Sequence, residues 1–95
     1  MRIFAGVVGF EWDGGNKDKN LKKHGVSSDE CEDVFQDAKR QFYPDIEHST
    51  TEKRHVVVGA TKGGKILRIA FTIRNERVRV ISSRAINRKE RKLYD

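Results

Sequence analysis

The chain has 95 residues and a formal net charge of +6, and it is 36% hydrophobic and 36% charged. A chain of this length has room for one hydrophobic core, so we predict a single domain over residues 1–95, in which residues 1–9 form a frayed extension or an extra edge strand. One cysteine excludes an internal disulfide, and no apolar stretch is long enough to span a membrane. We therefore expect a cytoplasmic protein that has no membrane partner.

The positive charge is concentrated in the second half of the chain. Residues 48–95 contain 13 Lys and Arg against 4 Asp and Glu, a net of +9, whereas residues 1–47 contain 7 against 10, a net of −3. Because predicted strands rather than a disordered tail carry this charge, we expect a surface that binds a polyanion, with RNA or DNA as the first candidates. An acidic protein partner would fit the same surface, and both partners remain open.

The first half of the chain contains the signals of two helices. Residues 16–24 are rich in Lys and end at a glycine, which predicts a helix with Leu21 as its main apolar anchor. Ser27 and Glu30 have the spacing of a capping box. They predict the start of a second helix, which ends near residue 37.

Alternating or continuous apolar runs predict five strands, at residues 10–13, 41–43, 54–61, 66–73 and 78–83. The last three form a meander, in which Gly63-Gly64 and Asn75-Glu76 are two-residue hairpin turns. Residues 87–94 follow as a charged helix. The prediction is an α+β fold in which two N-terminal helices pack on a small antiparallel sheet, with a C-terminal helix after it.

Two-residue turns also predict which side chains share a face of the meander. Val56, Val58 and Ala60 then lie on one apolar face with the apolar residues of the next strand. The opposite face carries no acidic residue from the strands and holds His55, Gly59, Arg68, Thr72, Arg74, Arg77, Arg79, Ile81 and Ser83. A solvated face usually mixes charges of both signs, so we favour a phosphate-binding surface over an ordinary solvated face.

Cleavage of RNA without a metal requires a base, an acid and cations that stabilise the charge on phosphorus. The three histidines lack the spacing of a metal site, and one cysteine cannot complete a thiolate site, so we predict neither a metal nor a cofactor. The predicted catalytic residues are His48, Glu52, Arg54, Arg74 and Arg84. The predicted RNA-binding residues are Lys23, His55, Arg68, Arg77, Arg79 and Ser83. For Glu52 and Arg54, the alternative interpretation is an exposed ion pair without a catalytic role.

Short motifs along residues 10–95 resemble those of one family, the BrnT toxins. These motifs are Phe10-Glu11-Trp12-Asp13, Lys17, Asn20, Lys23-His24-Gly25-Val26-Ser27, Val34-Phe35-Gln36-Asp37, Asp45, His48-Ser49, Glu52-x-Arg54, Gly59, Arg74, Ile81-Ser82-Ser83-Arg84, Glu90-Arg91 and Tyr94. They occur in the expected order, and as a set they are specific. Residues 1–9 are extra, and Ala38 stands where the family often has proline.

The resemblance implies a RelE-like fold and a ribonuclease that blocks translation. It also implies a BrnA-like antitoxin partner, which carries a ribbon-helix-helix part and through which alone the complex would bind operator DNA. The leading hypothesis from the sequence is therefore a metal-independent endoribonuclease toxin. The alternative is a module that binds RNA or its protein partner without catalysis.

Overall fold

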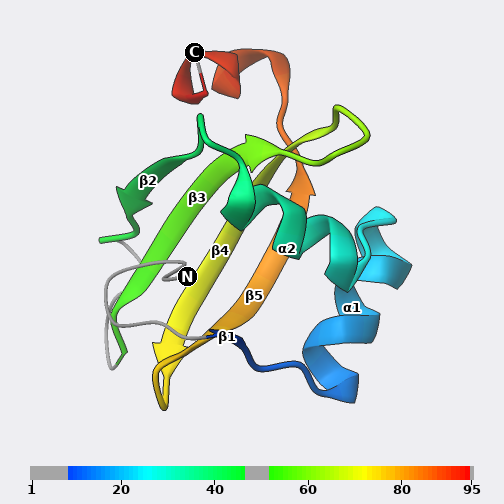
Figure 1. The fold of residues 1–95 in the computed structure, drawn as a ribbon, viewed down its shortest axis with the longest axis vertical. Helices are drawn as coiled ribbons and strands as arrows, with labels where there is room; N and C mark the ends of the chain where they lie inside the picture. Colours follow the sequence, from blue (N-terminus) through cyan, green and yellow to red (C-terminus); the bar gives the residue numbers. More distant parts are fainter. Residues whose placement is uncertain (1–8, 47–51, 95) are drawn as a thin grey trace.

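The computed structural model describes residues 9–46 and 52–94, which form one sheet with its covering helices (Figure 1). The elements in chain order are β1 (Gly9–Phe10), α1 (Gly14–His24), α2 (Ser28–Gln36), β2 (Gln41–Pro44), β3 (Arg54–Ala60), β4 (Ile66–Arg74), β5 (Arg77–Ala85) and η1, a 3-10 helix (Arg88–Leu93). The strand order is β1-β5-β4-β3-β2. In Figure 1, α2 crosses in front of the sheet, α1 lies on the β5 side, and η1 lies beyond one end of the strands.

The sheet is mixed, which corrects the predicted all-antiparallel arrangement. β1 pairs in parallel with β5, with Gly9 opposite Arg77 and Phe10 opposite Val78. These two strands are joined through the rest of the chain and not by a hairpin, so no turn imposes an antiparallel direction. The predicted strand at residues 10–13 is shorter than expected. The Glu11 N–H still donates to the Val78 carbonyl at 2.8 Å, and the chain then leaves the sheet toward α2, where Trp12 Nε1 donates to Glu32 Oε2 at 2.8 Å.

The two helices differ in how firmly they are held. The capping box of α2 is confirmed: Glu30 N–H donates to Ser27 Oγ at 3.2 Å, and Ser27 N–H donates to Glu30 Oε1 at 3.0 Å. The predicted apolar anchor of α1 was wrong, because the Leu21 side chain is 53% exposed. Val26, which follows α1, is buried in the core instead.

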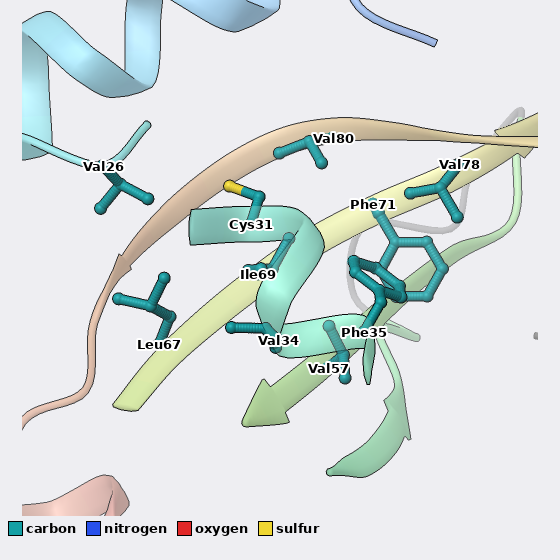
Figure 2. Close-up of a cluster of buried hydrophobic side chains, with 10 residues drawn as sticks. All are labelled: Val26, Cys31, Val34, Phe35, Val57, Leu67, Ile69, Phe71, Val78 and Val80. Carbon is teal, nitrogen blue, oxygen red and sulfur yellow. The ribbon is translucent and has the colours of Figure 1, made fainter. Parts of the chain in front are cut away.

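The core lies between α2 and the sheet (Figure 2). Its buried residues are Val26, Cys31, Val34, Phe35, Val57, Leu67, Ile69, Phe71, Val78 and Val80. Phe35 packs edge-on against Phe71, with ring centroids 5.0 Å apart. α2 comes close to β3 at Gly59, where a Cβ would lie 2.9 Å from Val34 Cγ1. Glycine is therefore required there by space and not by backbone conformation.

The turn between β4 and β5 is confirmed as a two-residue turn. Arg74 pairs with Arg77, and both Asn75 (φ 51°) and Glu76 (φ 62°) have the left-handed conformation that such a turn needs. The register of this hairpin shifts further along, because Phe71 pairs with Val80 whereas Ala70 pairs with Ser82. The intervening residue of β5, Ile81, has no partner in β4, which is a β-bulge.

The turn between β3 and β4 differs from the prediction. Thr61 N–H donates to the Lys65 carbonyl at 2.8 Å, so the loop has three residues, 62–64, with Gly64 at φ 89°. The predicted pairing of Lys62 with Lys65 was therefore wrong by one residue, and every residue of β3 faces the opposite way. Val57 faces the helices, and so do His55 and Gly59, which were expected on the other side.

The C-terminal element is a short 3-10 helix and not the expected helix of residues 87–94. It begins with a capping box between Asn87 and Glu90, but its residues are almost all charged and none is buried, so no apolar face favours an α-helix. It is attached by Tyr43, whose hydroxyl donates to the Leu93 carbonyl, and by Tyr94, whose hydroxyl donates to Asp37 Oδ2 at 2.7 Å. Within residues 9–46 and 52–94, no helix is long and apolar enough to cross a membrane.

Candidate nucleic-acid interface

Six arginines project from the outer face, which we define as the face of the sheet opposite α1 and α2. Strand alternation places on it Arg54, Arg68, Arg74, Arg77, Arg79 and Arg84. The middle of this face is buried at Val56, Val58 and Thr72, of which the two valines were expected on the helix side. The arginines are therefore grouped at its two ends.

One group, which we call the turn-end cluster, lies where the β4–β5 turn meets the start of β3. It contains Glu11, Asp13, Glu52, Arg54, Arg74, Arg77 and Arg79. Arg74 holds Glu52 in a bidentate pair, with Nε to Oε2 at 2.7 Å and Nη2 to Oε1 at 2.9 Å. Arg79 bridges Glu11 Oε1 at 2.8 Å and Asp13 Oδ2 at 2.7 Å.

These pairs fix the charge states of the turn-end cluster. The hydrogen bond from Arg74 lowers the pKa of the Glu52 carboxyl below its ordinary value, so Glu52 is ionised at neutral pH. The same bond raises the pKa of Arg74, and hydrogen bonds to Asp13 and Glu11 raise the pKa of Arg79. A guanidinium that binds a carboxylate through two N–H groups has a geometry that also fits a phosphate.

The other group, the far-end cluster, contains Arg68, Arg84 and Glu90. Arg84 Nη1 and Nη2 donate to the two oxygens of Glu90 at 2.6 and 2.7 Å, and Arg68 Nε lies 3.6 Å from Glu90 Oε2. The hydrogen bonds from Arg84 lower the pKa of Glu90 to about 2. Glu90 also accepts the Asn87 N–H, so this cluster attaches η1 to the sheet.

The structure does not bring the predicted catalytic residues together. Arg84 pairs with Arg68, and Arg68 lies six residues from Arg74 along β4, which is roughly 20 Å in a strand. Glu52, Arg54 and Arg74 belong to one cluster, whereas Arg84 belongs to the other. His48 lies outside the described residues.

The predicted RNA-binding residues are also dispersed. Arg68, Arg77 and Arg79 are on the outer face as expected, and Lys23 is exposed at the end of α1. Ser83 was expected there too, but the bulge in β5 turns it inward, where it is fully buried and accepts from the Cys31 thiol at 3.2 Å. His55 is on the helix side, where its ring stacks on Phe71 with centroids 5.3 Å apart. Burial and the nearby Lys53 lower the pKa of His55, which keeps it neutral at neutral pH.

Three carboxylates that pair with the arginines were not among the predicted site residues: Glu11, Asp13 and Glu90. Glu11 and Arg79 are 68 positions apart, and Glu90 lies outside the strands, so the three meander strands alone show no acid on this face. A signal was present in the alternation of residues 10–13, which places Glu11 and Asp13 on the same side. Among the described residues, no three His, Cys, Asp or Glu side chains gather into a group that would hold a metal ion.

The sequence profile of the BrnT family, the ribonuclease toxins of type II toxin–antitoxin systems, matches residues 12–90. The chain belongs to the BrnT toxin family. It is also similar in fold to the ribonuclease toxin BrnT of Brucella abortus, solved by crystallography at 1.1 Å. That match has a TM-score of 0.64 at 21% identity and covers 86% of this chain and 100% of the other. No curated protein matches the chain closely enough to count as a relative.

Membership of the BrnT family makes RNA the substrate and a cognate antitoxin the partner of this toxin. The structure also explains one pair of the family's motif residues, Asp37 and Tyr94. Asp37 Oδ2 accepts the Tyr94 hydroxyl and the Ala60 N–H at 2.7 and 2.8 Å, which joins the end of α2, the end of β3 and the C-terminal segment. Burial alone would raise the pKa of Asp37, but these hydrogen bonds lower it below its ordinary value. Asp37 and Tyr94 therefore have a structural role in this chain.

Proposed function

We propose that this BrnT toxin is an endoribonuclease that cleaves RNA at the turn-end cluster without a metal ion and thereby inhibits translation. The observation that carries this proposal is the bidentate pair between Arg74 and Glu52. It combines a cation of the correct shape for phosphate with an ionised carboxylate at the same position. An RNA phosphate that displaces Glu52 from Arg74 leaves the carboxylate beside the sugar, with a pKa closer to its ordinary value and thus a greater basicity.

The reaction is a transesterification in which each residue has one task. Glu52 takes the proton of the 2′-hydroxyl, and the 2′-oxygen forms a bond to phosphorus. The bond from phosphorus to the 5′-oxygen breaks, and that oxygen takes a proton, for which His48 remains the predicted donor. Arg54 and Arg74 stabilise the charge that develops on the phosphorus oxygens. Arg84 and Arg68 contact a phosphate farther along the strand, because they lie at the far-end cluster.

Control by a ribbon-helix-helix antitoxin is part of the same proposal. The turn-end cluster contains three outer-face arginines in addition to Arg74, so acidic antitoxin segments would compete with RNA for it. α1 and α2 are joined by a short turn, but Cys31, Val34 and Phe35 pack α2 against the sheet, so this pair does not present a recognition helix to a DNA groove. Operator DNA would therefore be bound through the antitoxin.

The test is cleavage of RNA by the purified toxin in EDTA. The unsubstituted toxin should give products with a 2′,3′-cyclic phosphate and a 5′-hydroxyl. Arg74→Ala and Glu52→Gln should each reduce the rate about a hundredfold, which is typical for the loss of one preorganised group. Lys62→Ala is the matched control, because Lys62 is an exposed cation in the other hairpin loop and should leave the rate unchanged.

Three outcomes would contradict the proposal. Full cleavage by the Arg74→Ala variant, with unchanged melting temperature, would remove the turn-end cluster as the site. Loss of all cleavage in EDTA and its return with a divalent cation would show that the reaction needs a metal. RNA that binds but is never cleaved under either condition would favour a non-catalytic binding module.

A further inference from the structure

A hollow of about 390 Å³ lies beside the edge strand β2, where β2 ends and β3 begins. Its lining residues come from β2, from the segment after it and from the start of β3: Phe42, Tyr43, Pro44, Ile46, Lys53, Arg54 and His55. Most of these side chains present carbon surfaces, two are cations and none is acidic. The hollow is distinct from the arginine–carboxylate pairs that serve the proposed reaction.

The walls of the hollow are flat rings held in place by the core. His55 stacks on Phe71 at an interplanar angle of 29°, and Phe42 meets Phe71 edge-on with centroids 6.2 Å apart. Phe71 is itself fully buried against Phe35. The rings are therefore fixed before any ligand arrives, which reduces the entropy lost when a ligand stacks on them.

The rim of the hollow is continuous with the turn-end cluster. Lys53 follows Glu52 directly in the chain, and Arg54 pairs with Thr72, two residues from Arg74 along β4. The backbone here is fixed, because the Thr72 hydroxyl donates to the Lys53 carbonyl at 2.9 Å and the Asp45 N–H donates to the Arg54 carbonyl at 3.1 Å. The hollow and the turn-end cluster therefore share Arg54, and Lys53 connects the hollow to Glu52 along the chain.

From this juxtaposition we infer that the hollow binds a nucleobase of single-stranded RNA, next to the phosphate held by the turn-end cluster. Flat aromatic walls suit a base, and the two cations among the lining residues, Lys53 and Arg54, suit the phosphate attached to it. Only a base that has left the stack can enter, so the hollow selects single-stranded over duplex RNA. The inference rests on the proposed function for the identity of the ligand, but it concerns binding and not catalysis.

The test uses Ile46, whose side chain is 81% exposed, so that its replacement leaves the core intact. The probe is a short single-stranded oligonucleotide with 2′-O-methyl groups, which cannot be cleaved through the 2′-oxygen. Ile46→Asn should weaken binding of this probe about tenfold, within the range that stacking of one base contributes. The matched control is Leu21→Asn, which removes an exposed apolar side chain of α1 and should leave affinity unchanged.

A second probe separates the base from the phosphate. An oligonucleotide that lacks one base should bind the unsubstituted toxin about tenfold more weakly when the abasic position is the one at the hollow. This abasic probe should bind the Ile46→Asn variant as tightly as it binds the unsubstituted toxin, because the base that would contact the hollow is already absent. Equal affinity of every abasic probe and the complete probe would overturn the inference.

The remaining outcomes also decide the question. If Ile46→Asn weakens antitoxin binding and leaves oligonucleotide binding unchanged, the hollow serves the protein partner and the inference is wrong. Failure of the proposed function is separate, since it would appear as unchanged cleavage by the Arg74→Ala and Glu52→Gln variants. If the toxin does not cleave RNA but still binds the abasic probe more weakly than the complete probe, this inference stands and the proposed function fails.

Discussion

Glu90 performs two structural tasks with one carboxylate. It completes the capping box at the start of η1, and it accepts both terminal nitrogens of Arg84 on β5. The start of η1 is thus attached to the sheet through one ionised side chain, in addition to the bonds that Tyr43 and Tyr94 make near its end. Its partner Arg84 is consequently a residue whose removal affects stability as well as any contact with RNA.

The pKa of Glu90 makes this attachment dependent on pH. In the folded protein the pKa is about 2, below its ordinary value of 4.5. Its contribution is therefore complete above pH 4.5 and is lost as the pH falls toward 2, on the order of 1 to 2 kcal/mol after solvent screening. Glu90→Gln should lower the melting temperature at pH 7, and the difference from the unsubstituted toxin should shrink below pH 4.

The matched control for this prediction is Glu76→Gln, which removes the charge of an exposed carboxylate in the β4–β5 turn. Melting followed by circular dichroism at a series of pH values measures both variants. An equal loss at pH 7 and pH 3 for Glu90→Gln would show that the hydrogen-bonding shape of the carboxylate matters and its charge does not.

At the scale of the elements, local signals were sufficient for some features and not for others. The capping box of α2 and the turn at Asn75-Glu76 involve residues within a few positions of one another, and both were predicted correctly. Gly63-Gly64 fits a loop of two or three residues equally well, so the register of β3 was missed. Contacts that only the folded chain makes, such as that of Gly59 with α2, distinguish the two registers.

The same limit explains why only part of the site was predictable. The places of Arg68, Arg74, Arg77 and Arg79 on the outer face follow from the strand pattern and were predicted correctly. Arg84 was not expected on this face, and the bulge in β5 turns it there. The face on which the Ser83 side chain lies depends on a bulge that no local motif marks. The face of the His55 side chain depends on the length of the loop between β3 and β4. Glu11 and Asp13, the partners of Arg79, come from a segment remote in sequence, and Glu90, the partner of Arg84, comes from η1 after the sheet, so the pattern of the meander strands does not reveal them.

The close approach of α2 to β3 gives a prediction at Gly59. An added methyl group would lie 2.9 Å from Val34 Cγ1 and 3.1 Å from the Val34 carbonyl oxygen, so the helix must move. Gly59→Ala should reduce the free energy of unfolding by about 2 kcal/mol, which is typical of an overpacked core. Urea denaturation measures the loss.

Gly63→Ala is the control for Gly59→Ala, because the nearest atom to its new Cβ would be Thr61 Oγ1 at 3.8 Å, an ordinary contact. It should change stability little. Comparable losses for the two variants would mean that α2 is not tightly packed against Gly59.

At the scale of the whole molecule, the two halves of opposite charge neutralise each other in part. Arg79 of the basic half pairs with Glu11 and Asp13 of the acidic half, and Lys65 lies 3.1 Å from Glu30. The net charge of +6 is nevertheless that of a protein attracted to polyanions. RNA and an acidic antitoxin segment would both have to displace carboxylates that are already in place.

Competition for one surface is therefore the prediction at this scale. Antitoxin titrated into a complex of the toxin with labelled 2′-O-methyl RNA should release the RNA, as measured by fluorescence anisotropy. The affinities of RNA and of the antitoxin, each measured separately, should both fall at higher salt, because screening weakens the charge complementarity of both complexes. RNA that stays bound while cleavage of ordinary RNA stops would move the antitoxin contact to another surface, for which η1 is the next candidate.

Ile81 is one extra residue in β5 that has no pairing partner in β4. Val80 is opposite Phe71 and Ser82 is opposite Ala70, so a chain without Ile81 would retain every other pairing between β4 and β5. Val78, Val80 and Ser83 would still face the helices, and Arg79 and Arg84 would still face away. A deletion inside β4 would instead reverse the facing of all residues on one side of it. A chain one residue shorter could therefore have this fold if the missing residue were Ile81. The side chains of β4 and β5 would then lie on the same faces as they do here.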